Sequence, residues 1–480
     1  MQKRIFAVIG IIIVFRFMAH IPIPLSNPQT LRQVLETLFT SADTPQFLSF
    51  INVLSGGALA NFSIMLVGLG PYINASIIMQ LLTKAIPKLE ALNKEGEYGR
   101  KKINQMTRML TLPLAIIQSI GALYLVKQSA SQIAGLGDIT ANSSPMQWVL
   151  MIAALTGGSM MLMWLGELIT EQGIGNGISL LITVGIVASL PQTIAGLVSS
   201  IFENNSNWTI AGINLPISRT AFLYFVFITI AVLVMTVFVV KLNEAQRRLT
   251  VNYAKRVQGN RTYGGVTTVL PVKLITAGVV PIIFAVAFLS VPSFAGQIMS
   301  SSSNPRLQEL GVNLSTWFQT PSAQTFQNGD WHAYIYPVVY FLLVFLFTFF
   351  YTSIAFNAKD IAENLQKQGG FIANIRSGIE TETYLTKVVN RLTLFGALAL
   401  GILAVVPIAG EAFFGNNLGI AGTSILILVA VSLETLRKIE SRALMVTYNQ
   451  YDGTDFFQMP DEEKPSRFSK LKPKLPRRKK

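Results

Sequence analysis

One short motif in this sequence has the spacing of a catalytic centre. Gly135, Gly137 and Asp138 satisfy the GxGD pattern of aspartyl proteases that cleave within membranes. Acid and base catalysis by carboxylates needs a second aspartate facing the first, and no apolar segment of the chain supplies one. The motif also falls in a polar stretch between apolar segments. We therefore reject proteolysis at this motif.

Other reactive side chains are missing or wrongly spaced. The chain contains no cysteine, which excludes a disulfide framework and a metal site with thiolate ligands. It holds neither the HExxH pair of zinc proteases nor the GxxxxGK[ST] loop that cradles nucleotide phosphates. We therefore expect no enzyme activity, no catalytic residue, no bound metal and no cofactor. Any energy that the protein uses must come from a partner.

The elements that position the remaining residues are apolar helices. Of 480 residues, 51% are hydrophobic and only 13% are charged, and the mean hydropathy is +0.48. A soluble fold of this length could not bury so much apolar material. A helix that spans a bilayer needs about 20 mostly apolar residues. Ten segments approach this requirement, namely 5–23, 62–83, 109–126, 147–166, 177–198, 220–240, 270–294, 333–351, 393–407 with its flanks, and 418–433.

Lysine and arginine are distributed unevenly among the loops between these segments. Of the 38 basic residues, 33 fall at the start of the chain, in alternate loops and in the tail after residue 436. Loops rich in lysine and arginine remain in the cytoplasm. We therefore expect a multi-pass protein with both termini cytoplasmic, which agrees with an even number of spans. The net charge of +14 then follows from topology and does not by itself indicate nucleic-acid binding.

The ten spans divide the chain into two halves of five. We place the N-terminal half within residues 1–240, with spans one to five in 5–198, and the C-terminal half, with spans six to ten, in 220–436. An odd number of spans per half makes the second half enter the membrane from the opposite side, as in an inverted repeat. Pro71 and Pro281 fall near the start of the second span of each half, where interrupted helices often border a pathway. A packed kink in an ordinary bundle explains these prolines equally well.

Three stretches outside the spans differ from ordinary connecting loops in their length or their composition. Residues 241–270 and 356–387 are long for loops in a compact bundle, and long ordered loops tend to be functional. The tail, 437–480, is basic and rich in proline. We expect this tail to be disordered in the cytoplasm and close to anionic lipid or RNA.

Residues 50–61 are apolar but too few to cross a membrane. A helix of twelve residues reaches about 18 Å, whereas the hydrocarbon core of a bilayer is about 30 Å thick. This segment must therefore be re-entrant, interfacial or packed inside the protein.

Several longer strings along the chain resemble the SecY family of protein-conducting channels. They occur in the order and at the spacings that this family shows, from the first span to the tenth. They are FRFMAHIPIP (15–24), LSGGAL (54–59), PYINASIIMQLL (71–82), EGEYGRKKINQMTR (95–108), MWLGELITEQGIGNGISL (163–180), QRRLTVNYAKR (246–256), AGVVPIIF (277–284), FNAKDIAENLQKQGGFI (356–372) and AGTSILI (421–427).

This resemblance implies an all-α polytopic membrane protein. Ten transmembrane helices would form two inverted halves of a clamshell around an hourglass pore, with a plug half-helix and a lateral gate that opens to lipid. The family implies conduction of unfolded secretory proteins across the bacterial cytoplasmic (inner or plasma) membrane and lateral release of membrane segments. It also implies partners, namely the small membrane subunits SecE and SecG, the motor ATPase SecA, the ribosome, signal peptides and nascent chains, and anionic lipids.

The family match assigns roles to individual residues. A channel that passes any peptide but no ions needs a deformable apolar constriction without fixed binding sites, and branched aliphatic side chains meet that need. The positions that match the family's pore ring are Leu69, Ile73, Ile178, Ile182, Ile283 and Ile427. The positions that match the plug are Phe50, Ile51, Asn52, Val53, Leu54, Ser55, Gly56, Gly57, Ala58 and Leu59.

The match also covers the two long loops and the second span. Arg256, Arg261 and Arg376 correspond to positions where the ribosome or the motor docks. Ser377 follows the last of these where relatives commonly have proline, which bears on the rigidity of that loop. Gln80 corresponds to a position beside the lateral gate, where polar groups stabilise the closed state.

An ion-coupled secondary solute transporter is the alternative, because such transporters also use inverted repeats and broken helices. Transporters of this kind place Asp, Glu or His within their spans. The central parts of the ten segments hold none, and His20 lies near the end of the first. The lack of Asp, Glu and His in the centres of the segments favours a channel for polypeptides over an ion-coupled transporter.

Overall fold

Helices make up most of this protein. The computed structural model describes residues 2–23, 62–132, 144–203, 208–210, 213–215, 219–253, 256–258, 261–263, 265, 267–300, 304–319, 321, 325–326, 329–414 and 422–452. Within them, ten helices match the ten predicted spans. They are α1 (Gln2–Met18), α4 (Gly70–Ala85), α6 (Glu97–Gln132), α7 (Pro145–Gln172), α8 (Gly177–Glu203), α9 (Arg219–Glu244), α10 (Val280–Ser300), α13 (Ile335–Ala355), α15 (Ile379–Phe414) and α16 (Gly422–Asp452).

By length and apolar composition, six helices of the described part can cross a membrane. These six segments lie in α6, α7, α9, α10, α13 and α15, and residues 177–191 of α8 form a shorter apolar helix. The prediction of a multi-pass membrane protein is confirmed.

Short elements connect the long helices. They are α5 (Pro87–Lys94), α11 (Pro305–Trp317), η1 (Trp331–Tyr334), α14 (Ala358–Lys367), β1 (Trp208–Ile210), β2 (Ile213–Leu215), β3 (Gln246–Tyr253), β4 (Arg256–Gln258), β5 (Arg261–Tyr263), β6 (Thr267–Lys273) and β7 (Gly370–Ile372). β3 pairs with both β6 and β7 in an antiparallel three-stranded sheet, and β1 with β2 and β4 with β5 form two-stranded ribbons.

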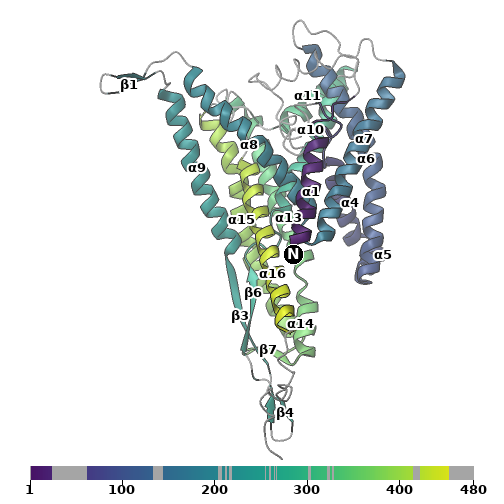
Figure 1. The fold of residues 1–480 in the computed structure, drawn as a ribbon, viewed down its shortest axis with the longest axis vertical. Coiled ribbons are helices and arrows are strands. Elements are labelled where there is room, and N and C mark those ends of the chain that lie inside the picture. The colour runs from purple at the N-terminus through teal and green to yellow at the C-terminus, as the bar shows by residue number, and fades with distance from the viewer. Residues whose placement is uncertain are drawn as a thin grey trace, which may run out of the picture.

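The two halves of the chain interlock, since α8 of the first half lies against α9 and α16, and α10 of the second half lies against α4 and α6. In Figure 1, α1, α4, α5, α6 and α7 occupy one side of the bundle, and α9, α15 and α16 occupy the other. The start of α1, β3, β6, α14 and the late part of α16 all lie toward one end, where β4 projects farthest. We call this end the basic side, because it carries the loops in which lysine and arginine are concentrated.

Two helices begin later than the sequence predicts. The second span was expected to start at residue 62, but residues 62–69 form turns and α4 begins at Gly70. Non-helical backbone at membrane depth is tolerated where protein buries it, and all of these residues except Ile64 are buried. The seventh span was expected from residue 270, but residues 267–273 are strand β6 and α10 begins at Val280.

Pro71 and Pro281 begin helices and do not bend them. Pro71 occupies the first turn of α4, and Pro281 is the second residue of α10. Proline suits the first turn because its missing N–H has no helical partner there. A packed kink is therefore not the role of either proline.

The basic side also differs from the prediction. The tail was expected to be disordered from residue 437, but α16 continues to Asp452, so the prediction is wrong for residues 437–452. Residues 453–480 lie outside the described part of the chain. α6 and α15 likewise extend beyond the segments 109–126 and 393–407, and each contains 36 residues.

Candidate functional site

The six predicted ring positions come from four helices and belong to one large apolar cluster. Leu69, at the N-cap of α4, is 1% exposed, and Ile182 of α8 is also 1% exposed. Ile73, Ile283 and Ile427 are also buried members of the same cluster, and the half-buried Ile178 packs against it. Because α4 and α8 belong to the first half and α10 and α16 to the second, the cluster joins the two halves.

The starts of α4 and α10 share one local geometry. Gly68 and Gly278 each precede the proline by three residues, and both have φ of 63°. Only glycine adopts this left-handed conformation without steric cost. In each half the proline is followed two residues later by a ring isoleucine, Ile73 or Ile283. The same turn therefore sets the depth of one ring residue in each half.

Residues 62–69, which precede α4, are held by the segment that follows α1 and by α7. Ile23 N–H donates to the Phe62 carbonyl at 3.0 Å, and Ile64 N–H donates to the Ile21 carbonyl at 3.0 Å. From α7, the Ser159 hydroxyl donates to the Gly68 carbonyl at 2.9 Å. The ten predicted plug residues, 50–59, lie outside the described residues.

Gln80 contacts the opposite half of the protein. The Tyr351 hydroxyl of α13 donates to Gln80 Oε1, and Gln80 Nε2 donates to the Ser76 hydroxyl at 3.0 Å. The Tyr351 ring packs edge-on against Phe284 of α10, with ring centroids 5.0 Å apart. Phe284 in turn packs edge-on against Phe347 at 6.3 Å. One polar contact and an aromatic cluster thus lie where α4 faces α10 and α13.

Sequence reasoning missed Tyr351. The signal was available, because α13 is almost entirely apolar and a buried tyrosine hydroxyl usually finds a hydrogen-bond partner. Its partner could not be identified from spacing, since Gln80 and Tyr351 are separated by 271 positions.

The two predicted docking loops form one folded unit. β7, from the second loop, pairs with β3 of the first, and Val251 lies opposite Ile372. Buried residues of β3, β6, α14, β7 and α15 form a separate apolar cluster beneath this sheet. Gly370 is tightly packed here, because a Cβ at this position would lie 3.1 Å from Tyr253 Cε1 and 3.3 Å from Val251 Cγ1.

The three predicted docking arginines lie at separate places in this unit. Arg256 belongs to β4 and pairs with Tyr263, and Arg261 belongs to β5 and pairs with Gln258. Arg376 is exposed in the turn between β7 and α15. Its carbonyl accepts a hydrogen bond of 2.7 Å from the Thr381 hydroxyl, which fixes this turn despite the absence of the proline.

Two ion pairs lie on the basic side, in different surroundings. Arg108 of α6 donates through Nε to Glu167 Oε1 of α7 at 2.8 Å, and its Nη2 lies 2.7 Å from Oε2. This two-point geometry suits a guanidinium and a carboxylate. Lys94 lies 2.9 Å from Glu90 within α5 and lowers the pKa of that fully exposed carboxyl.

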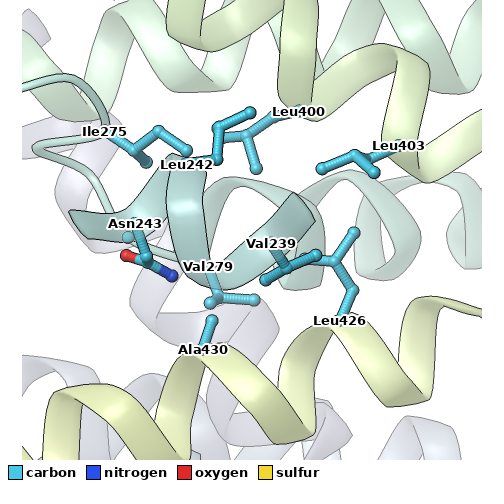
Figure 2. Close-up of a pocket in the computed structure, with 10 residues that line it drawn as sticks. Val239, Leu242, Asn243, Ile275, Val279, Leu400, Leu403, Leu426 and Ala430 are labelled. Carbon is cyan, nitrogen blue, oxygen red and sulfur yellow. The ribbon is translucent and has the colours of Figure 1, made fainter. Parts of the chain in front are cut away.

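A small cavity lies between α9, the start of α10, α15 and α16 (Figure 2). Its volume is about 10 Å³, close to the room that one water molecule occupies. Its lining residues are Val239, Leu242, Asn243, Ile275, Gly278, Val279, Leu400, Leu403, Leu426 and Ala430. Sites for small molecules measure roughly 300–1,000 Å³, so this cavity is too small to bind a transported solute. Among the described residues, no group of His, Cys, Asp and Glu could hold a metal ion.

Comparison with known proteins identifies close relatives along nearly the whole chain. A family model named SecY matches residues 63–436. The protein translocase subunit SecY of Streptomyces galbus is 38% identical over 455 residues, which cover 94% of this chain and 97% of the relative. Its namesake from Corynebacterium glutamicum is 38% identical over 453 residues, with coverage of 93% and 96%.

Solved structures agree at the level of the fold. A structure described as that of a protein conducting channel has a TM-score of 0.59 at 17% identity, and covers 90% of this chain and 91% of its own. Sec61 in the canine ribosome-channel complex from the endoplasmic reticulum has a TM-score of 0.54, also at 17% identity, with the same coverage. These likenesses confirm the predicted helical channel fold.

Proposed function

The chain belongs to the SecY family, and we propose that it is the central channel subunit of a Sec translocase. It conducts unfolded secretory proteins across the bacterial cytoplasmic membrane and releases membrane segments sideways into the lipid. It is a channel and not an enzyme, so the driving force comes from its partners.

The observation that carries this proposal is the buried aliphatic cluster built by both halves. Leu69, Ile73, Ile178 and Ile182 come from one half, and Ile283 and Ile427 from the other. Aliphatic side chains offer no ligand to an ion, and they repack around a passing chain because dispersion contacts are individually weak. Because both halves of the protein contribute side chains to this ring, the ring also widens when the halves move apart. These properties suit a constriction for polypeptides.

The segment before α4 supports a plug at residues 50–61. A plug that leaves the pore and returns needs a fixed attachment on at least one side. Residues 62–69 follow the proposed plug directly, and three hydrogen bonds join them to the segment after α1 and to α7. The proposed plug is thereby tethered to the half that carries Leu69.

The contact between Gln80 and Tyr351 supports a lateral gate at this place. It links α4 to α13, and the aromatic residues beside it link α10 to α13. An opening between α4 on one side and α10 with α13 on the other would expose the interior to lipid. Opening this seam would break the hydrogen bond that crosses it.

The basic side is proposed to face the cytoplasm and to receive the partners. The positive-inside rule supports this orientation. Docking of the ribosome and of SecA at Arg256, Arg261 and Arg376 is supported by the folded unit that carries them. The ribosome-channel complex of Sec61 is a structural precedent. SecE and SecG are the proposed small subunits, signal peptides and nascent chains the proposed clients, and anionic lipids the proposed contacts of the tail.

Reconstitution tests this function. The chain is purified with its small subunits and placed in vesicles, and motor, ATP and a preprotein bearing a signal sequence are added. We expect the preprotein to become protected from external protease only when all components are present. A preprotein without its signal sequence serves as the control. Absence of protection together with saturable uptake of a small solute would refute the channel and favour a transporter.

A further inference from the structure

The last helix continues far beyond the buried core. α16 has 31 residues, and at about 1.5 Å per residue it is about 46 Å long. Ala430 and Val431 are its last buried residues before it leaves the bundle toward the basic side (Figure 1). We call residues 432–452 the α16 extension.

Arg437 of the α16 extension binds the end of α9. Its Nη1 donates to the Asn243 carbonyl at 3.3 Å, and its Nη2 lies 3.8 Å from Glu244 Oε1. α9 ends at Glu244. The last carbonyls of a helix lack helical partners and carry partial negative charge, so a guanidinium is well suited to this position.

Arg442 binds the end of α7 in the same way. Its Nη1 donates to the carbonyl of Gln172, the last residue of α7, at 3.4 Å. Gly173 follows with φ of 70°, and a Cβ there would lie only 2.1 Å from Arg442 Nη2. The guanidinium therefore lies directly against the Gly173 backbone. α7 has no basic residue in its own last turn, so the cation at this helix end is supplied by another helix.

Of these two contacts, only the one made by Arg442 joins the two halves of the protein, because α9 and α16 both belong to the second half. Arg437 and Arg442 are five positions apart, which places them about 140° apart around the helix. One therefore reaches α9 of the second half, while the other reaches α7 of the first. Two residues before Arg437, Thr435 meets the turn that connects α7 to α8, since a Cβ on Gly175 would lie 3.5 Å from its Oγ1.

The two halves thus meet along two seams of different character. The gate seam, where α4 faces α10 and α13, is crossed by the hydrogen bond from Tyr351 to Gln80. The rear seam, where the α7–α8 turn and α8 face α16, is crossed by Arg442. We propose that Arg437 and Arg442 make the α16 extension a pivot, which holds the α7–α8 turn and the end of α9 in place while the gate seam opens.

The placement of the ring residues explains what this pivot achieves. α8 begins directly after the turn that Arg442 holds, so Ile178 and Ile182 stay fixed relative to Ile427 of α16. Leu69 and Ile283 border the gate seam and separate when it opens. The ring then opens from one side. This inference rests on the proposed channel function, because only a channel that opens needs a pivot.

Paired cysteines test the pivot, since the chain has no cysteine of its own. The Cβ built on Gly175 lies 3.5 Å from Thr435 Oγ1, where the sulfur of a cysteine would lie, so Gly175→Cys with Thr435→Cys places the two thiols close enough to test for a disulfide. Gln80→Cys with Tyr351→Cys, joined by a short bifunctional thiol reagent, locks the gate seam as the matched control.

We expect the oxidised rear pair to translocate preprotein at the rate of its reduced form. The bridged gate pair should lose translocation. Loss of translocation on oxidation of the rear pair, restored by reduction, would overturn the pivot and leave the channel function standing. If neither the reduced pairs nor the parent chain translocated, the channel function itself would be refuted, and the pivot with it.

A distance measurement separates a pivot from a merely structural contact. Spin labels on Glu171→Cys and Glu440→Cys, both exposed, report the separation across the rear seam. We expect one narrow distance distribution in resting channels and in channels holding a stalled preprotein. Arg442→Gln should broaden it in the stalled state, and Arg442→Lys should broaden it less. Lys438→Gln is the control, since Lys438 pairs with Glu434 within α16. An unchanged distribution in Arg442→Gln would overturn the role of this arginine.

Discussion

Removing one hydroxyl from the gate seam should make the channel easier to open. In Tyr351→Phe the ring that packs on Phe284 remains, while the hydrogen bond to Gln80 is lost. Neutral hydrogen bonds contribute about 0.5–1.5 kcal/mol, and those between membrane helices average about 0.6 kcal/mol. Because about 1.4 kcal/mol corresponds to a factor of ten, the open state should gain roughly three- to tenfold in population.

The same helix offers a matched control. Tyr340 is 1% exposed, and its hydroxyl has no hydrogen-bond partner among the described residues. Tyr340→Phe therefore makes the same chemical change without removing a contact across the seam. It should leave gating unchanged, and it should slightly stabilise the fold because it removes an unsatisfied buried group.

Two assays follow the gate in reconstituted vesicles. Tyr351→Phe should raise the resting ion leak and improve translocation of a preprotein with a weakened signal sequence. A double-mutant cycle with Gln80→Met isolates the pair, since the double variant should resemble either single variant if both act through one bond. Identical leak in Tyr351→Phe and Tyr340→Phe, or strict additivity in the cycle, would refute the assignment of this bond to the closed gate.

Three further predictions concern the ring, the attachment of the plug and the basic side. Ile283→Asn should raise ion leak and relax signal selectivity, because its amide group would hydrate the constriction. Ile283→Leu should keep the seal. Equal ion conductance in the two variants would count against the proposed ring. Gly158→Ala should lower thermal stability by about 1–3 kcal/mol, because its Cβ would lie 2.1 Å from the Ile64 carbonyl. Gly157→Ala should not lower thermal stability, because no atom lies within 4 Å of a Cβ built at that position. Equal melting temperatures of the two variants would disprove the close approach of Gly158 to the Ile64 carbonyl. A double-mutant cycle of Arg108→Gln and Glu167→Gln should give a coupling free energy of about 0.5–1 kcal/mol in thermal unfolding. The matching cycle of Lys94→Gln and Glu90→Gln should show no coupling, because that pair is exposed. A larger coupling for Lys94 and Glu90 than for Arg108 and Glu167 would contradict the stabilising role of the second pair.

Much of this fold follows from local chemistry. The ten helices coincide with apolar runs, because a membrane protein satisfies its backbone within each helix. The first residues of α4 and α10 could not be predicted from apolar composition. Residues 62–69 and 270–279 are as apolar as the helices that follow, and turns or strand pairing replace helical bonds there. Gly68 and Gly278 were the local signal for these boundaries, since both adopt a left-handed backbone conformation.

The partners of side chains across the bundle were beyond prediction from one sequence. The isoleucines of the proposed ring were assigned by family resemblance alone, because an isoleucine in an apolar helix looks the same whether it faces lipid, core or pore. Gln80 was singled out, yet Tyr351 was not, since the contact depends on how α4 and α13 pack. The part of α16 after residue 436 was read as disordered because its charges resembled a tail. Two of those charges, on Arg437 and Arg442, instead bind helix ends that lie 194 and 270 positions away.

The two seams are crossed by different kinds of hydrogen bond, which suit one seam to opening and the other to remaining closed. At the gate seam the polar link joins two side chains, Gln80 and Tyr351, and either side chain can swing to another rotamer without disturbing a helix. At the rear seam the acceptor is the backbone carbonyl of Gln172 at the end of α7, so release would leave that helix end without its cation. Side-chain links are therefore suited to repeated opening, and links to helix ends are suited to remaining closed. In the proposed channel, opening the gate seam alone would move Leu69 and Ile73 away from Ile283 and leave Ile178 and Ile182 of α8 against α16. If both seams opened, neither seam would hold the two sides of the proposed ring together.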